Sequence, residues 1–208
     1  MPSSPALPKL ILASSSAYRR ELLGRLRLPF EAISPDIDES ARDNELPEQT
    51  AMRLAQEKAE VIAKIRPDSV VIGSDQVATL NGEQIGKPGN HQAALRQLQK
   101  MRGHQVIFHT ALCLLDARIK KKNHSSHFDL QLLNVQTLVS FRDLSDQELD
   151  AYLHIEQPYD CAGSAKNEGL GIAIIEKIIS DDPTALTGLP LIALTTMLRN
   201  VGFIFFKV

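Results

Sequence analysis

The run at residues 70–73, Val-Val-Ile-Gly, contains no polar residue that would mark a solvent-facing side. A half-exposed strand alternates apolar and polar residues, so an uninterrupted apolar run predicts a strand covered on both faces. Helices are the usual cover, and the preceding stretch 47–65 predicts one. It begins with Pro47, which suits a first helical turn, and repeats apolar residues at helical spacing. The run therefore predicts an α/β protein with a central sheet.

The other segments alternate strand and helix signals without a strict βαβ repeat, which favours a mixed sheet over an all-parallel one. Asn81 and Gly82 are typical of a tight hairpin turn. Ser145 and Glu148 form a capping box at the start of a helix. We expect a single domain over residues 1–208. The expected strands are 9–13, 30–33, 70–73, 77–80, 83–85, 106–115, 130–141 and 172–179, and the expected helices are 17–26, 47–65, 91–101, 145–155 and 190–200.

Charge and cysteine content exclude several classes of protein. The chain has 23 Lys and Arg against 25 Asp and Glu, and a net charge of −2 argues against a general nucleic-acid binder. Cys113 and Cys161 form neither a C-x-x-C pair nor a disulfide framework, which favours a reduced setting. No apolar run approaches the roughly 20 residues of a membrane span, and the first residues do not resemble a signal peptide. We therefore expect a cytoplasmic protein without a membrane partner.

Serines 14–16 lie between an expected strand and an expected helix, and Arg19 and Arg20 follow in the first helical turn. Cations at a helix N-terminus oppose the helix dipole. A bound phosphate would remove that conflict, since free N–H groups and guanidinium groups both bind anions. An ordinary serine cap with solvated arginines explains the same residues without a ligand.

Asp75 follows the apolar run, so we expect it at the end of a strand and at the rim of the sheet, where ligand sites gather. A carboxylate there would hold Mg²⁺ or orient a water molecule, and the alternative is a turn-forming aspartate. Lys87 in the turn 86–89 suits a phosphate contact, and Lys58 on the helix 47–65 is a weaker candidate. Taken alone, each lysine is better explained as a solvated side chain, Lys58 more so than Lys87.

Other patterns are uninformative or exclude a chemistry. The segment 163–171 is rich in glycine, but it does not match G-x-G-x-x-G and so does not indicate a dinucleotide site. No G-x-S-x-G elbow supports acyl transfer. His124 and His127 have a metal-like spacing, but without nearby cysteine or carboxylate partners a structural role is favoured. The basic residues above, with carboxylates at Asp36, Asp38, Glu39 and Asp75, indicate phosphoryl chemistry on a polyanion.

Several segments, in a fixed order from residue 10 to about 202, resemble the Maf family of nucleoside triphosphate pyrophosphatases. They are LILASSSAYRRELL, PDIDE, RLAQEKA, VVIGSDQV, NGEQIGKP, FRDLSDQELDAYL, CAGSAKNEGLG and DDPTALTGLPLIAL. The resemblance implies hydrolysis between the α and β phosphates of a nucleoside triphosphate, with a divalent cation, Mg²⁺ or Mn²⁺. It also implies a mixed twisted sheet flanked by helices, with two lobes around a deep cleft, similar to inosine triphosphate pyrophosphatase.

The resemblance also assigns roles to individual residues. Asp75 corresponds to the proton-accepting aspartate of the family. Asp38 corresponds to an acidic residue near the metal, which Asp38 or Glu39 would hold together with Asp75. The residues expected to bind phosphate in the same cleft are Ser14, Arg19, Lys58 and Lys87, with Arg20 beside them.

Three positions resemble the subgroup of the family that acts on 7-methyl-GTP: Tyr18, Gln76 and Glu168. Members acting on dTTP and UTP typically carry Arg, Thr and Gln there. An aromatic face attracts the cationic 7-methylguanine, and a carboxylate can accept its N1–H and N2–H. Tyrosine is a weaker cation–π partner than the tryptophan common in the subgroup, and Ala17 stands where the family usually has proline.

Two other functions stay open. One is a dTTP- or UTP-type pyrophosphatase, including housecleaning of modified pyrimidine nucleotides, and the other is a non-catalytic nucleotide-binding regulator of septum formation. The family is often dimeric, and the apolar tail 203–206 is a candidate edge strand or cover for a homodimer interface.

Overall fold

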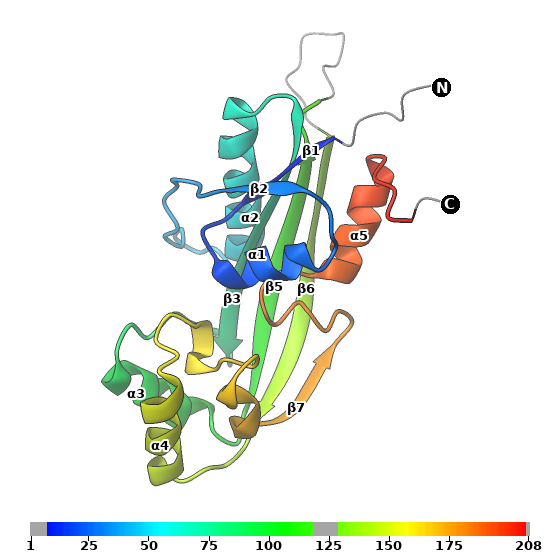
Figure 1. Cartoon of the computed structure of the whole chain (residues 1–208). Coiled ribbons are helices and arrows are strands. Elements are labelled where there is room, and N and C mark those ends of the chain that lie inside the picture. The colour runs from blue at the N-terminus through cyan, green and yellow to red at the C-terminus, as the bar shows by residue number, and fades with distance from the viewer. Residues whose placement is uncertain (1–7, 119–128, 207–208) are drawn as a thin grey trace.

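The computed structural model describes residues 8–118 and 129–206. The described chain folds into a seven-stranded mixed sheet flanked by helices, as the sequence predicts (Figure 1). Two short 3₁₀ helices cover Ala162–Ser164 and Leu170–Ile174. The strands are β1 (Lys9–Ala13), β2 (Phe30–Ile33), β3 (Ser69–Leu80), β4 (Glu83–Ile85), β5 (Gln105–Asp116), β6 (Asp129–Phe141) and β7 (Ile175–Ser180). The α-helices are α1 (Ala17–Gly24), α2 (Pro47–Ile65), α3 (His91–Met101), α4 (Asp146–Glu156) and α5 (Leu191–Asn200).

The strand order is β2-β1-β3-β5-β6-β7, and β4 pairs with β3. Strand β1 runs parallel to β2 and β3, whereas the remaining pairs are antiparallel. The chain crosses between the parallel strands through α1 and α2, as parallel connections require. The hairpin of β3 and β4 turns at Asn81 and Gly82, which both have positive φ, as predicted.

The apolar run in β3 is buried on both faces. Val70 and Ile72 pack with α1 and α5 on one side of the sheet. Val71 packs on the other side against alanines and Ile62 of α2. Each face of the strand therefore has its own helical cover, which is why the run has no polar residue.

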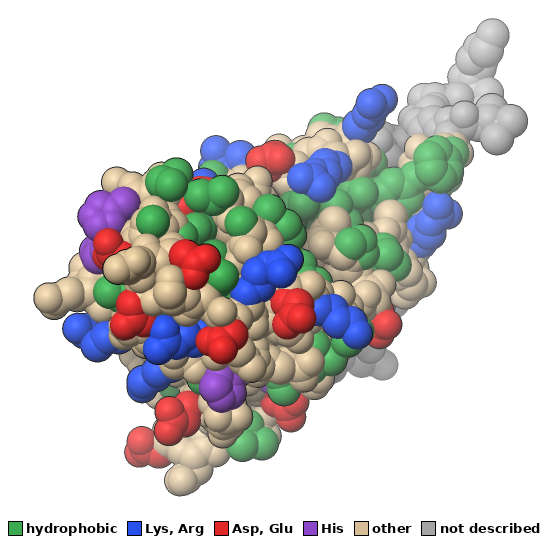
Figure 2. Space-filling model, turned by 90° about the horizontal axis from the view of Figure 1, so that it is seen from below, with side chains coloured by type: hydrophobic (Ala, Val, Ile, Leu, Met, Phe, Trp, Pro, Cys, Tyr) green, Lys and Arg blue, Asp and Glu red, His purple; other side chains and the backbone are tan. Residues whose placement is uncertain are grey.

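A second lobe forms at the far end of the long strands, where α3 and α4 pack against β3, β5 and β6 (Figure 1). Its core includes Leu98 of α3, Leu153 of α4, and Phe108 and Phe141 of the sheet. Seen from below, basic and acidic side chains are mixed over the surface of this lobe (Figure 2). The expectation of two lobes on one sheet is confirmed.

The structure corrects one important prediction. Strand β3 does not end at residue 73 but continues to Leu80, so Asp75 lies inside the strand opposite Ala111 and not at its end. Polar residues 74–76 do not interrupt the strand because each side chain finds a partner. Ser74 Oγ donates to the carbonyls of Ala111 and Gly188 at 2.8 and 2.9 Å, and Asp75 accepts from a lysine described below.

Two smaller predictions are also wrong. Residues 172–174 belong to a 3₁₀ helix and not to β7. The chain turns tightly here, because the backbone of Lys166 lies so close to Gly171 that it leaves no space for a Cβ there. The tail 203–206 is not a strand: Phe203 is buried with α5, and its N–H donates to the Leu198 carbonyl.

The loop residues 119–127, including His124 and His127, lie outside the described residues. None of the described helices has the length and hydropathy to cross a membrane.

Candidate functional site

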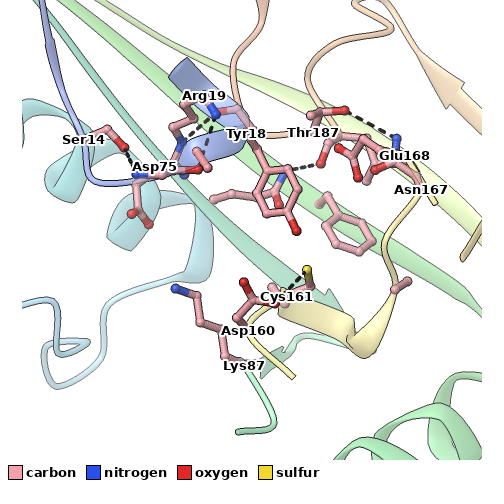
Figure 3. Close-up of a pocket in the computed structure, with 18 of the residues that line it drawn as sticks. Ser14, Tyr18, Arg19, Asp75, Lys87, Asp160, Cys161, Asn167, Glu168 and Thr187 are labelled. Carbon is pink, nitrogen blue, oxygen red and sulfur yellow. Dashed lines mark hydrogen bonds between the residues drawn. The ribbon is translucent and has the colours of Figure 1, made fainter. Parts of the chain in front are cut away.

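A cavity of about 580 Å³ lies where the two lobes meet. Besides β3, its wall includes residues of α2, β5, β6 and β7. The turn before α1 with the start of that helix, the loops before α2, α3 and α5, and the segment after α4 complete the wall. Figure 3 shows Ser14, Arg19 and Asp75 grouped on one side and Asn167 and Glu168 on the other, with Tyr18 between the two groups. The cavity therefore has two chemically different regions.

Lys58 links two carboxylates in the first region. Its Nζ lies 2.6 Å from Asp75 Oδ1 and 2.7 Å from Glu39 Oε1, and its side chain is only 6 % exposed. The interpretation of Lys58 as a solvated helix residue is thus wrong. Its burial is compensated by two opposite charges, as a buried ammonium requires.

Close packing of α2 on β3 brings these groups together. A Cβ at Gly73 would lie 2.0 Å from the Ala55 carbonyl oxygen, so only glycine allows the helix to approach the strand this closely. Lys58 is one helical turn beyond Ala55, and Asp75 is two residues beyond Gly73 on the same face of the strand. The local packing therefore sets the distance between ammonium and carboxylate.

The second carboxylate, Glu39, reaches the cavity from a loop. Burial by itself would raise the pKa of Glu39, but the hydrogen bond from Lys58 and the charges of Lys58, Lys87 and Arg19 outweigh it and hold the pKa below its usual value. Glu39 is therefore an anion in this cavity at neutral pH.

The loop that carries Glu39 is fastened to α2 by Arg53. Its Nε and Nη2 donate to the two oxygens of Glu45 at 2.6 and 2.7 Å, and Nη2 also donates to the Ser40 carbonyl at 3.0 Å. One helix thus supplies Lys58 and also holds the loop that presents its partner Glu39. No feature of the sequence alone distinguishes Arg53 from the other arginines.

The turn formed by serines 14–16 caps α1 and also lines the cavity. Ser16 Oγ accepts from the Arg19 N–H at 3.3 Å, and Ser14 Oγ, which is buried, accepts from the Ser16 N–H at 3.1 Å. Arg19 Nε donates to the Gly188 carbonyl at 2.9 Å, and burial lowers its pKa against the opposing charges of Asp75 and Glu39. Arg20 is exposed and does not line the cavity, so its expected place in the cleft is wrong.

The second region combines apolar and acidic groups. Burial, followed by the charges of Cys161 and Asp160, raises the pKa of the Tyr18 hydroxyl. In Figure 3 the Tyr18 ring lies beside the segment after α4. Glu168 lines the same region. The apolar part of the wall consists of Phe108, Val139, Phe141, Ala162, Ala165, Ile175 and Leu186.

Gln76 holds the wall of the cavity in place. Its Nε2 donates to the carbonyls of Ala185 and Leu186 at 3.1 and 3.0 Å, and to Thr110 Oγ1 at 2.9 Å. The amide nitrogen is therefore engaged by the loop before α5. Only the carbonyl oxygen of this side chain is left to contact a ligand directly.

Sequence reasoning assigned no role to the loop before α5, although Leu186, Thr187 and Gly188 line the cavity. Asp182 shapes this loop, since its Oδ2 accepts from the Ile192 and Ala193 N–H groups at the start of α5. Asp182 is eight positions before the predicted helix start, too far for a local capping signal, so the sequence alone does not indicate this contact.

Most of the sequence-predicted site residues meet in this cavity. Asp38 does not line it; its Oδ1 accepts from the Ser40 N–H at 2.9 Å at the exposed side of the loop. Asp36 also lies outside the lining. The predicted site residues that line the cavity are Ser14, Tyr18, Arg19, Glu39, Lys58, Asp75, Gln76, Lys87 and Glu168.

The residues present fit a hard divalent cation. Glu39 and Asp75 each use one oxygen for Lys58, and within the described residues their second oxygens accept no hydrogen bond. Carboxylate oxygens are the ligands that Mg²⁺ and Mn²⁺ prefer. Two free oxygens on neighbouring carboxylates that line one cavity meet that requirement.

Comparison with known proteins finds a matching family and relatives that share one name. The Maf-like protein family matches residues 9–201. The 7-methyl-GTP pyrophosphatase of Ralstonia nicotianae is 63% identical over 196 residues, 94% of this chain and 97% of that protein. The enzyme of the same name from Cupriavidus metallidurans is 60% identical over 201 residues, 97% of each chain. A solved dITP/XTP pyrophosphatase from Mycobacterium abscessus is similar with a TM-score of 0.43 and 15% identity, over 93% of this chain and 96% of that one.

Proposed function

This chain belongs to the Maf-like protein family, and on that premise we propose that it hydrolyses 7-methyl-GTP to 7-methyl-GMP and diphosphate in the housecleaning of modified nucleotides. Relatives about 60% identical over nearly their whole length are named for that substrate. The observation that carries the proposal is the shared cavity, which Lys58 also lines and in which Glu168 lies across from Arg19 with Tyr18 between them.

Tyr18 and Glu168 are proposed to select the base. Methylation at N7 gives guanine a positive charge, which the face of the Tyr18 ring attracts by roughly 1–2 kcal/mol in a desolvated site. The Glu168 carboxylate accepts the N1–H and N2–H of guanine and matches the charge. Gln76 supports this selection by holding residues 185 and 186 in the wall of the cavity.

Arg19, Lys58 and Lys87 are proposed to bind the triphosphate, with Ser14 at the turn below it. The triphosphate is a stronger anion than either carboxylate and competes with them for the Lys58 ammonium. Asp75 is then free to accept a proton from the attacking water. The water oxygen bonds to the α-phosphorus, the bond between the α-phosphorus and the bridging oxygen breaks, and diphosphate leaves.

Glu39 and Asp75 would hold the divalent cation, with Asp38 nearby in the same loop. When bound, Mg²⁺ or Mn²⁺ supplies positive charge that neutralises the phosphates. An activity on free nucleotides accords with a cytoplasmic location, and Cys113 and Cys161 are both free thiols.

Release of diphosphate, measured across 7-methyl-GTP, GTP, dTTP and UTP, tests the proposal. We expect the highest kcat/KM with 7-methyl-GTP. Faster turnover of dTTP or UTP would replace the proposal with the pyrimidine alternative. Tight nucleotide binding by calorimetry without any diphosphate would instead indicate the non-catalytic regulator.

A further inference from the structure

The second lobe carries a cluster of metal-ligating side chains that the reaction above does not use. His91 stands at the first position of α3, and Asp150 and His154 lie one turn apart on α4. One ligand atom from each residue lies within 4.8 Å of the other two. No other set of three or more such residues meets this criterion among the described residues.

Asp150 lies between the two imidazoles. Its Oδ1 is 2.8 Å from His91 Nε2, and its Oδ2 is 3.3 Å from His154 Nδ1. The two rings have their centres 4.5 Å apart. Figure 2 shows histidine and acidic side chains next to each other at one edge of this face. Solvent reaches all three residues, with side chains 31 %, 45 % and 68 % exposed for His91, Asp150 and His154.

Both imidazoles have hydrogen-bond partners that fix their rings. His91 Nδ1 is 3.0 Å from the Tyr159 hydroxyl, and His91 Nε2 is 2.8 Å from Asp150 Oδ1. His154 Nδ1 lies 2.9 Å from the Asp150 backbone carbonyl, which can only accept, so this nitrogen carries the proton and His154 Nε2 has the lone pair. When His91 Nδ1 donates to the Tyr159 hydroxyl, His91 Nε2 likewise has a lone pair beside the Asp150 carboxylate.

This arrangement also fits what transition metals need from their surroundings. Metal-binding histidines almost always use the second ring nitrogen in a hydrogen bond that fixes the ring. Tyr159 supplies that partner to His91. Two imidazoles and one carboxylate suit Zn²⁺ and similar divalent transition metals with a fourth ligand from water, whereas Mg²⁺ prefers oxygen ligands.

We propose that His91, Asp150 and His154 form a second metal site, selective for Zn²⁺-class divalent transition metals and separate from the carboxylates around Lys58. The site joins α3 to α4 next to two segments of the cavity wall. The Gly89 N–H donates to the Tyr159 carbonyl at 2.9 Å, and the chain reaches the cavity two residues before Gly89, at Lys87, and one residue after Tyr159, at Asp160. A bound metal would therefore stabilise this edge of the cavity.

Calorimetric titration of the full chain with Zn²⁺, in a buffer that contains excess Mg²⁺ and no other transition metal, tests the site. Absorption spectra with Co²⁺ in place of Zn²⁺ report the ligand geometry. We expect His154→Ala to weaken Zn²⁺ binding at least 10-fold and to remove the tetrahedral Co²⁺ bands. Because its side chain is mostly exposed, this variant should fold normally. Tyr159→Phe should weaken binding by about 10-fold, since loss of a second-sphere partner typically costs 10–100-fold.

His104→Gln is the matched control, because it removes another exposed imidazole that contacts only a backbone carbonyl. That variant, Asp75→Asn and the double variant His124→Asn/His127→Asn should all bind Zn²⁺ as the wild type does. Absence of Zn²⁺ binding in the wild type, or binding unchanged in His154→Ala, would overturn the proposal. Loss of binding in any control would assign the metal to another place and would also overturn it.

Discussion

The Lys58 ammonium and the Asp75 carboxylate lie 2.6 Å apart in the wall of the cavity, although the two residues are 17 positions apart in the chain. The same ammonium also binds Glu39. In the proposed reaction, Lys58 changes partners when the triphosphate arrives, so Asp75 is restrained without substrate and released with it. This relationship makes Asp75 the first residue to test.

Asp75→Asn should lower kcat by about 10²–10⁴-fold while nucleotide binding is retained, because the amide keeps an oxygen for Lys58 but cannot accept the proton of water. Diphosphate release and calorimetric titration with 7-methyl-GTP measure the two quantities separately. Asp36→Asn is the matched control, since Asp36 lies outside the cavity, and it should act like the wild type. Wild-type turnover by Asp75→Asn would remove Asp75 from the mechanism.

The double variant Tyr18→Arg/Glu168→Gln should shift the preference from 7-methyl-GTP towards dTTP and UTP. An arginine repels the cationic base, and a loss of 1–2 kcal/mol of cation–π attraction corresponds to about 5–30-fold in kcat/KM. The measurement is kcat/KM on each nucleotide. Tyr18→Phe keeps the ring face and should leave the preference nearly unchanged. If the double variant kept its preference, base selection would have to lie elsewhere in the cavity.

The sequence predicts most of this fold because its elements are marked locally. Pro47 and the alanine-rich stripe define α2, Asn81 and Gly82 define a hairpin, and the capping box at Ser145 defines the start of α4. Each of these signals depends on residues within a few positions of one another. Such signals survive in the folded protein because tertiary packing supports them.

The predicted site was less complete, because its decisive contacts are long-range. The sequence of α2 does not reveal that a carboxylate lies opposite Lys58. It also does not reveal that Ser74 and Gln76 donate hydrogen bonds to the loop before α5, which lets the strand continue through Asp75. For Arg53 only the i,i+4 pair with Glu57 is local, and its contacts to the loop before α2 carry no sequence signal. Family resemblance compensated for part of this, because it relates distant residues directly.

Gly73→Ala should destabilise the protein by about 1–3 kcal/mol or more, because the added Cβ would lie 2.0 Å from a backbone oxygen and must push α2 away from β3. Activity should fall as well, since the same movement separates Lys58 from Asp75. Urea denaturation measures the loss of stability. Gly24→Ala is the matched control: nothing lies within 4 Å of the new Cβ, so its stability should be unchanged or slightly higher. Equal stability of both variants would contradict the close-packing argument.

Arg53→Lys should loosen the loop that carries Glu39, because lysine cannot reproduce the two-pronged contact with Glu45. We expect faster amide hydrogen exchange over residues 38–46 and a several-fold weaker response of activity to Mg²⁺. Arg42→Lys is a suitable control, since that mostly exposed arginine makes one side-chain ion pair with Glu57 and should contribute below about 1 kcal/mol. Unchanged exchange in Arg53→Lys would show that the loop is held by other contacts.

Glu45 gives the pH dependence of the same loop. Its hydrogen bond from Arg53 is the main cause that lowers the pKa of Glu45 from 4.5 to about 2, helped by the Arg42 N–H and the Thr50 hydroxyl against the effect of burial. Because the folded-state pKa is the lower one, the stabilisation is complete above pH 4.5 and is lost as pH falls from 4.5 towards 2. Glu45→Gln should therefore lower the free energy of unfolding by about 1–2 kcal/mol at pH 7 and flatten its decline over that acid range. Urea unfolding at a series of pH values measures both effects. Parallel pH profiles of the variant and the wild type would mean that the carboxylate of Glu45 does not gain its stability from Arg53.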